Sequence, residues 1–139
     1  MKFSTFDFKT EHIQLKVYES ILFVYYTPSS ELKKIDEDFA RKAVNDRLQF
    51  TQGKPYLMLV DARHFGEVTK QAMRYWSSEE AIQDVLAGAI VTDRSVTYMA
   101  AKLYLKLELL YKKPNFPADM FLSEKKAVSW LKKQSFLVC

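Results

Sequence analysis

The sequence predicts an α/β fold with a mainly parallel central sheet and an antiparallel hairpin at its N-terminus. Short runs of β-branched and aromatic residues alternate with longer segments in which apolar residues recur at helical spacing. Only the first two strand-like runs follow each other closely, as a hairpin requires. Each later run is separated from the next by a helix-length segment, so these strands need right-handed crossovers and lie parallel. The predicted element order is β-β-α-β-α-β-α-β-α.

The predicted hairpin consists of His12–Val17 and Ile21–Tyr26, joined by a short polar break. In the first run Ile13, Leu15 and Val17 alternate with polar residues, which is typical of a strand buried on one face. The second run is apolar or aromatic throughout, which indicates a strand buried on both faces.

A helix is expected after the hairpin, beginning within Thr27–Ser30 and ending near Phe50. Ser and Thr oxygens cap helix N-termini, and Pro28 suits a first helical turn. The segment Gly53-Lys54-Pro55 would stop the helix. The residues expected on its inner face recur at three- and four-residue spacing: Leu32, Ile35, Phe39, Ala43 and Val44.

The remaining elements follow from shorter signals. The motif Ser77-Ser78-Glu79-Glu80 reads as a capping box, with Ser77 placed before Glu80, and predicts that the helix beginning at Thr69 has two pieces. The other predicted elements are the strands Tyr56–Val60, Val85–Thr92 and Ala118–Leu122, the helix Val96–Tyr111 and a last helix opened by Ser123.

Length and composition indicate one domain that spans residues 1–139. Hydrophobic residues make up 48% of the chain and no composition break divides it, so one core is expected. Polar residues interrupt the apolar positions of the N-terminus, and no stretch has the ~20 consecutive apolar residues of a membrane span. We therefore expect a cytoplasmic protein with neither a signal peptide nor a transmembrane segment.

The residue inventory argues against a metal, a cofactor and nucleic acid as ligands. Cys139 is the single cysteine, and the 3 glycines form neither a phosphate loop nor a dinucleotide fingerprint. The 21 basic and 17 acidic residues are mixed along the chain, without the long basic runs that favour nucleic-acid binding. We expect no metal, no cofactor and no specific nucleic acid.

The element order resembles the STAS superfamily, whose fold is that of the bacterial anti-sigma-factor antagonists and is also called SpoIIAA-like. The resemblance covers nearly the whole chain and implies a regulatory role. More narrowly, the chain is similar to a group of small uncharacterised bacterial STAS-like proteins at these positions: Leu59-Val60-Asp61-Ala62-Arg63, Lys113-Pro114-Asn115-Phe116-Pro117, Met120-Phe121, Glu124, Ala127 and Trp130-Leu131.

The resemblance also implies a site of phosphorylation. In regulatory STAS domains a Ser or Thr at the start of the helix after the central strand is phosphorylated by the partner kinase, usually within Asp-Ser-Ser/Thr-Gly. The matching segment is Glu67-Val68-Thr69-Lys70. It keeps the hydroxyl as Thr69, whereas the preceding Asp and the following Gly are absent. Thr69 is therefore the candidate phospho-acceptor.

The loop of residues 61–70 is the best candidate for a binding site. It follows the carboxyl end of a predicted parallel strand and leads into a helix, where open α/β sheets place ligands. A helix start favours an anion, and Arg63, His64 and Lys70 could add charged hydrogen bonds to a phosphate or carboxylate.

Two other interpretations of this loop remain open. Thr69 could be only a helix cap, with Asp61 and Arg63 paired to neighbours such as Arg74. Alternatively, His64 and Asp61 could form the acid–base pair of a hydrolase-like enzyme.

The helix predicted at Val96–Tyr111 carries apolar residues on two sides. Tyr98, Leu105 and Leu109 form a second stripe opposite the core face, and an exposed stripe of this kind marks a contact surface for a protein partner or a second copy. Alternatively, the terminal segment Phe136-Leu137-Val138 covers this stripe.

The main functional hypothesis is a non-enzymatic regulatory or protein-interaction module. A carrier of a small apolar or anionic ligand is the first alternative, since some STAS relatives and the related CRAL-TRIO fold hold such molecules. The hydrolase-like enzyme is the second. A cavity lined by Tyr25, Met58, Trp76 and Met99 would favour the carrier.

Overall fold

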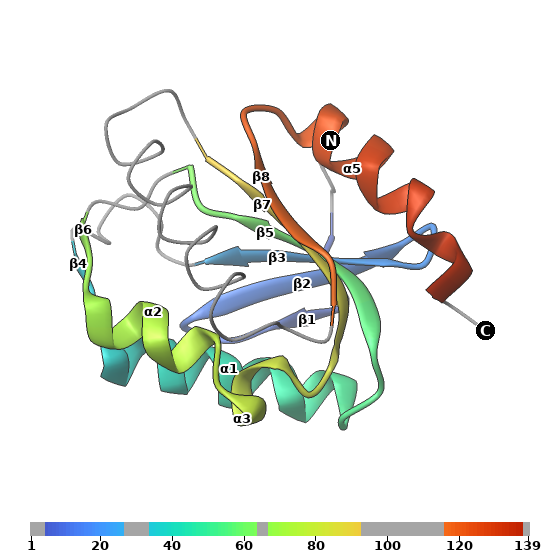
Figure 1. Ribbon diagram of the computed structural model, residues 1–139. Coiled ribbons are helices and arrows are strands. Elements are labelled where there is room, and N and C mark those ends of the chain that lie inside the picture. The colour runs from blue at the N-terminus through green and yellow to red at the C-terminus, as the bar shows by residue number, and fades with distance from the viewer. Residues whose placement is uncertain (1–4, 27–33, 64–66, 93–115, 138–139) are drawn as a thin grey trace.

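The computed structural model describes residues 5–26, 34–63, 67–92 and 116–137. These residues form a 6-stranded sheet in the order β1-β2-β3-β5-β7-β8 and a 2-stranded sheet of β4 and β6. Helices α1, α2 and α3 lie below the large sheet and α5 lies above it (Figure 1). The elements are β1 (Phe8–Lys9), β2 (Ile13–Tyr18), β3 (Ile21–Tyr26), β4 (Lys34–Ile35), α1 (Glu37–Thr51), β5 (Tyr56–Asp61), β6 (Glu67–Val68), α2 (Lys70–Trp76), α3 (Glu79–Ile82), β7 (Val85–Val91), β8 (Ala118–Phe121), α5 (Glu124–Lys133) and the 3-10 helix η2 (Ser135–Leu137).

Parallel pairing runs through the centre of the large sheet. β5 pairs with β3 on one side and with β7 on the other, and β7 pairs with β8, all in parallel. β1, β2 and β3 are joined by antiparallel pairing. Leu59 of β5 lies in register between Phe23 of β3 and Ala89 of β7. The predicted fold class is therefore confirmed.

Alternate residues of each central strand pack on opposite faces of this sheet. Phe23 and Leu59 belong to the cluster that packs with Leu131 of α5. Met58, the neighbour of Leu59 in the chain, belongs to the cluster on the other face, together with Ala43 of α1. Strands buried on both faces are expected at the centre of a parallel sheet.

Helix α1 begins at Glu37, so the predicted start within Thr27–Ser30 is wrong for the helix that ends at Thr51. Its N-cap is Asp36, whose carboxylate accepts a hydrogen bond of 2.9 Å from the amide of Phe39. Ile35, predicted on the helix, instead lies in β4 just before the cap. It is buried in one cluster with Ala40, and this pair forms a hydrophobic staple across the helix start. Residues 27–33 lie outside the described residues.

The strands β4 and β6 pair in parallel, and we call this pair the clasp. In the chain, β4 comes shortly before α1 and β6 shortly before α2. Lys34 pairs with Glu67 and Ile35 with Val68. The amide of Thr69 then donates a hydrogen bond of 3.0 Å to the carbonyl of Ile35. The clasp therefore holds the start of α1 beside the start of α2, and nothing in the sequence analysis predicted it.

The helix beginning after Thr69 has two pieces, as predicted, but the second piece has a different cap. Ser78, not Ser77, accepts the hydrogen bond from the amide of Ala81, at 3.3 Å. Ser78 has the extended backbone that an N-cap requires, with φ −74° and ψ 157°. Ser77 instead closes α2, since its hydroxyl donates to the carbonyl of Met73 at 3.1 Å.

A buried ion pair connects α1 to the chain entering β7. Arg47 donates to both carboxylate oxygens of Asp84, at 2.9 Å from Nε and 2.7 Å from Nη2. The hydroxyl of Thr51 also donates to Asp84, and Nη2 of Arg47 reaches the carbonyl of Ala81. All oxygens and most donors of this group are thus used inside the protein, as buried charges require.

The hairpin between β2 and β3 turns through two residues with left-handed backbone, Glu19 at φ 51° and Ser20 at φ 68°. Tyr18 and Ile21 pair on either side, so the turn has the two-residue form that favours Asn-Gly. Neither side chain present is suited to positive φ, and the turn is therefore strained.

Replacing Ser20 by glycine is expected to raise the free energy of unfolding by about 0.5–1 kcal/mol. The left-handed backbone costs an ordinary residue about 1–2 kcal/mol, and the extra freedom of unfolded glycine offsets about 0.5–1 kcal/mol of the relief. Denaturant unfolding measures the change. The matched control is Ser129→Gly on the exposed side of α5, where a loss of about 0.5 kcal/mol is expected. A loss at both positions would show that Ser20 carries no strain.

Candidate functional site

The candidate loop starts where three parallel strands end together. Tyr25 of β3 lies in register with Asp61 of β5, and Asp61 with Val91 of β7. Their side chains and the chain that follows Asp61 therefore meet at the carboxyl edge of the sheet. This is the edge at which ligands bind in open α/β folds.

Asp61 and Arg63 form a closed fork at this edge. Nε and Nη2 of Arg63 donate to the two carboxylate oxygens of Asp61, each at 2.9 Å, and the amide of Arg63 adds a third hydrogen bond at 3.0 Å. The hydrogen bond to Asp61 raises the pKa of Arg63, so the guanidinium stays charged. Asp61 therefore pairs with Arg63 itself, not with Arg74, which is exposed in the last turn of α2.

The ion pair between Asp61 and Arg63 determines which hydrogen-bonding groups of the two side chains are already used. Both oxygens of Asp61 accept hydrogen bonds from Arg63, so Asp61 is an ion-paired carboxylate. Asp61 is 9% exposed and Arg63 is 38% exposed in their side chains, so the outer side of the guanidinium faces solvent. Arg63 can still offer its remaining donors to a partner, but its fork is occupied.

A second pair, Tyr25 and Glu124, lies at the same edge and was missed by the sequence analysis. The hydroxyl of Tyr25 donates to Oε1 of Glu124, which is the first residue of α5 and is 7% exposed. Burial, followed by the hydrogen bond and the charge of Glu124, raises the pKa of Tyr25 far above its ordinary value. Tyr25 thus stays a protonated donor and ties α5 to the sheet.

The two pairs influence each other electrostatically. The charges of Asp61 and Arg63 act on the pKa of Tyr25, and the charge of Glu124 acts on the pKa of Arg63. Phe6 adds an edge-on ring contact to Tyr25 at 5.8 Å between centroids. We call these four charged or polar side chains, Tyr25, Asp61, Arg63 and Glu124, the edge cluster. It is a set of paired groups at the start of the candidate loop.

Thr69 is the N-cap of α2. Its hydroxyl oxygen accepts a hydrogen bond of 3.1 Å from the amide of Ala72, and its backbone is extended. The side chain is half-buried, whereas Lys70 beside it is exposed. The first turn of α2 contains no acidic residue, so the positive end of this helix is not neutralised by its own side chains.

Several predicted site residues lie outside the described residues. These are His64 of the loop, the stripe residues Tyr98, Leu105 and Leu109, and Met99 of the suggested cavity. No single cavity can be lined by Tyr25 and Met58, because Tyr25 packs with the cluster under α5 and Met58 with the cluster on the opposite face. The observation that would have favoured a ligand carrier is therefore not made for these two residues.

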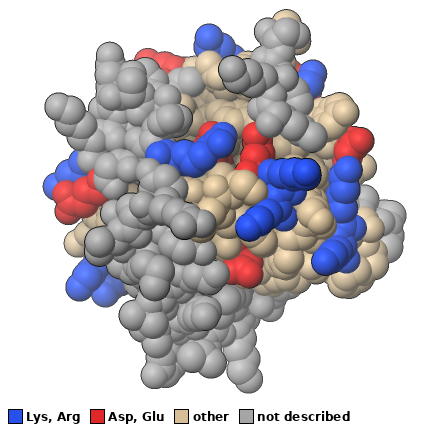
Figure 2. Space-filling model, turned by 90° about the horizontal axis from the view of Figure 1, so that it is seen from above, with Lys and Arg blue, Asp and Glu red and all other residues tan. Residues whose placement is uncertain are grey.

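The described surface carries charges of both signs. Seen from above, Lys and Arg side chains lie next to Asp and Glu side chains and form no continuous basic area among the residues described there (Figure 2).

The chain is similar in structure to an uncharacterised protein of the DUF3478 family from Shewanella loihica PV-4, whose crystal structure has a SpoIIAA-like fold. The TM-score is 0.58 at 12% sequence identity, and the match covers 88% of this chain and 97% of that chain. The protein therefore has a SpoIIAA-like fold, which confirms the resemblance found in the sequence.

The family is shown by a separate comparison. The model of a family described as "domain of unknown function (DUF7793)" matches residues 15–135, and this chain belongs to that family. None of the curated proteins matches the chain. Among the described helices, none combines the length and the apolar character that a bilayer crossing requires.

Proposed function

We propose that this protein is a non-enzymatic, cytoplasmic regulatory module, a single domain that binds a protein partner and is switched by phosphorylation of Thr69. The observation that carries the proposal is the position of Thr69 as N-cap of α2, after the central strand of a SpoIIAA-like sheet. Thr69 is partly exposed and lies beside the exposed Lys70.

The chemistry of this position supports a switch that leaves the fold intact. A phosphate on the N-cap adds a dianion at the positive end of a helix, where negative charge is favoured. The new charge changes the surface that a partner meets far more than it changes the core. The edge cluster supports binding instead of catalysis, because Asp61 is committed to Arg63.

The partner surface includes Thr69, Lys70 and Arg63 in this proposal. Arg74, a turn further along α2, adds an exposed positive charge. His64 in the loop and the stripe of Tyr98, Leu105 and Leu109 stay predictions for contacts with a protein partner or a second copy.

The switch is tested by comparing Thr69→Asp with the unmodified protein. Asp is a good N-cap, so the free energy of unfolding should change by no more than about 1 kcal/mol. Partner binding should fall at least tenfold, because the added charge imitates the phosphate. Affinity purification with mass spectrometry from native cells identifies the partner, and titration of the purified pair measures its affinity.

Two control variants separate the switch from the cap. Thr69→Ser keeps the hydroxyl and should keep full binding. Ser77→Asp places the same charge at the opposite end of α2 and should leave binding unchanged. Equal affinity of the Thr69→Asp variant and the unmodified protein would reduce Thr69 to a helix cap and end the proposal.

A further inference from the structure

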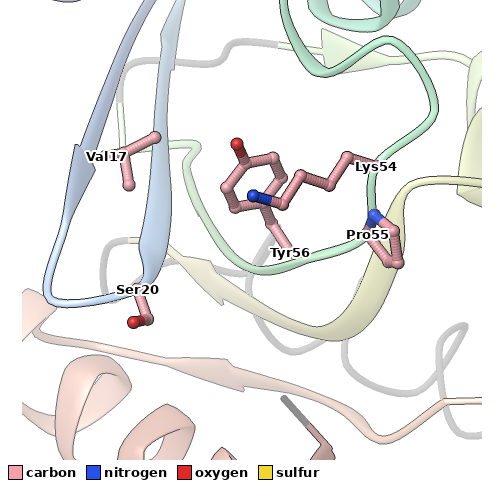
Figure 3. Close-up of a pocket in the computed structure, with 5 residues that line it drawn as sticks. All are labelled: Val17, Ser20, Lys54, Pro55 and Tyr56. Atoms are coloured by element: carbon pink, nitrogen blue, oxygen red, sulfur yellow. The ribbon is translucent and has the colours of Figure 1, made fainter. Parts of the chain in front are cut away.

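A pocket of about 240 Å³ lies at the edge of the sheet opposite to Thr69. It is formed where the β2–β3 turn approaches the chain entering β5 (Figure 3). The lining side chains are Val17, Ser20, Lys54, Pro55 and Tyr56. Three of them offer apolar surface, and only Lys54 carries a charge.

Lys54 is exposed and lies over the ring of Tyr56 at this pocket. Its side chain extends along the ring of Tyr56 toward the hairpin (Figure 3), with Nζ at 5.5 Å from the ring centroid. This cation–π contact orients the ammonium group without neutralising it. Among the residues that the structure describes, no carboxylate forms an ion pair with Lys54, so its charge is available to a ligand.

The rim of the pocket is the strained turn. Ser20 lines the pocket while its backbone is left-handed, at φ 68°. Glu19, the other left-handed residue, is fixed by an ion pair of 2.6 Å to Lys132 of α5. Backbone strain of this kind persists where surrounding contacts hold it, and it is concentrated at ligand sites.

We propose that this pocket binds a small monocarboxylic acid with an apolar body. The carboxylate meets the ammonium group of Lys54, and the apolar body lies against Val17, Pro55 and the edge of Tyr56. A single ammonium group matches the single charge of a carboxylate, whereas a phosphate dianion would need more donors. The site is separate from Thr69 and does not depend on the proposed switch.

The probe for this site is phenylacetate, titrated into the full chain and followed by amide NMR signals. We expect saturable shifts at Val17, Ser20 and Tyr56, with a dissociation constant in the millimolar range that is usual for a ligand of this size. Lys54→Gln should weaken binding at least fivefold. The matched control Lys125→Gln removes an exposed lysine of α5 and should leave the affinity unchanged.

Two analogues of phenylacetate test separately whether the charge and the ring contribute to binding. Phenylacetamide keeps the ring without the charge, and acetate keeps the charge without the ring, so each should bind at least fivefold more weakly than phenylacetate. Equal affinity of phenylacetate for the Lys54→Gln variant, equal binding of phenylacetamide, or shifts confined to other residues would each overturn the proposal.

Discussion

Replacing Phe23 by alanine is expected to lower the free energy of unfolding by about 3–5 kcal/mol. Phe23 is fully buried in the middle of β3, in register with Leu59 of the central strand. Its ring packs in the cluster between the sheet and α5, where a large-to-small change leaves a cavity that neighbouring strands cannot close. Urea unfolding of the purified protein measures the loss.

Phe136 provides the matched control. It is the same residue type but is 70% exposed, in the short helix η2. Phe136→Ala should change the free energy of unfolding by less than about 0.5 kcal/mol, as is usual for surface substitutions. A loss below 1 kcal/mol in Phe23→Ala would mean that β3 is not the centre of the core.

The second large effect is expected at the buried ion pair. Asp84→Ala should lower the free energy of unfolding by about 3–5 kcal/mol, because it leaves the charge of Arg47 buried without a counter-charge. Asp84 is 0% exposed and its carboxylate accepts from both Arg47 and Thr51. Denaturant unfolding with circular dichroism measures this change.

An exposed ion pair on α1, the helix that carries Arg47, is the control for the Asp84 substitution. Asp38 pairs with Lys42 at 2.9 Å, but both side chains are more than half exposed, at 74% and 55%. Asp38→Ala should therefore cost at most about 1 kcal/mol. The double variant Arg47→Met with Asp84→Ala should be more stable than Asp84→Ala alone, since the isolated charge is gone. If the double variant were the less stable one, the unpaired charge would not be the cause.

Much of the sheet could be predicted from sequence because its strands carry strong local signals. The run Ile21–Tyr26 and the run Tyr56–Val60 are apolar over their whole length, and their parallel pairing follows from the helix between them. The cap at Ser123 was also predicted, because a Ser before an apolar period is a local signal. These features depend on neighbours in the chain.

The errors concern signals that compete or lie far apart. Thr27–Ser30 and Asp36 both suit an N-cap, and sequence alone did not show that the staple of Ile35 and Ala40 favours Asp36 for α1. The pair of Tyr25 and Glu124 joins positions 99 residues apart, so no spacing rule reveals it. From sequence alone, a Glu at a helix start is interpreted as an acidic side chain that is stabilised by the helix dipole, and its burial is not apparent.

The site prediction was limited for the same reason. Thr69 could be located because caps are local, whereas the fork of Asp61 and Arg63 depends on the exact turn after β5. Sequence proximity suggested that Asp61 was available to His64. The geometry shows that the carboxylate accepts hydrogen bonds from Arg63, whereas His64 lies outside the described residues.

The clasp of β4 and β6 makes the starts of α1 and α2 one mechanical unit. Its connections are main-chain hydrogen bonds, including the one from Thr69 to Ile35, and Ile35 directly precedes the cap of α1. We therefore expect local opening of either helix start to loosen the other, because both share the same pairing. Because this connection is made by main-chain groups, a side-chain substitution that leaves the backbone in place does not remove its hydrogen bonds.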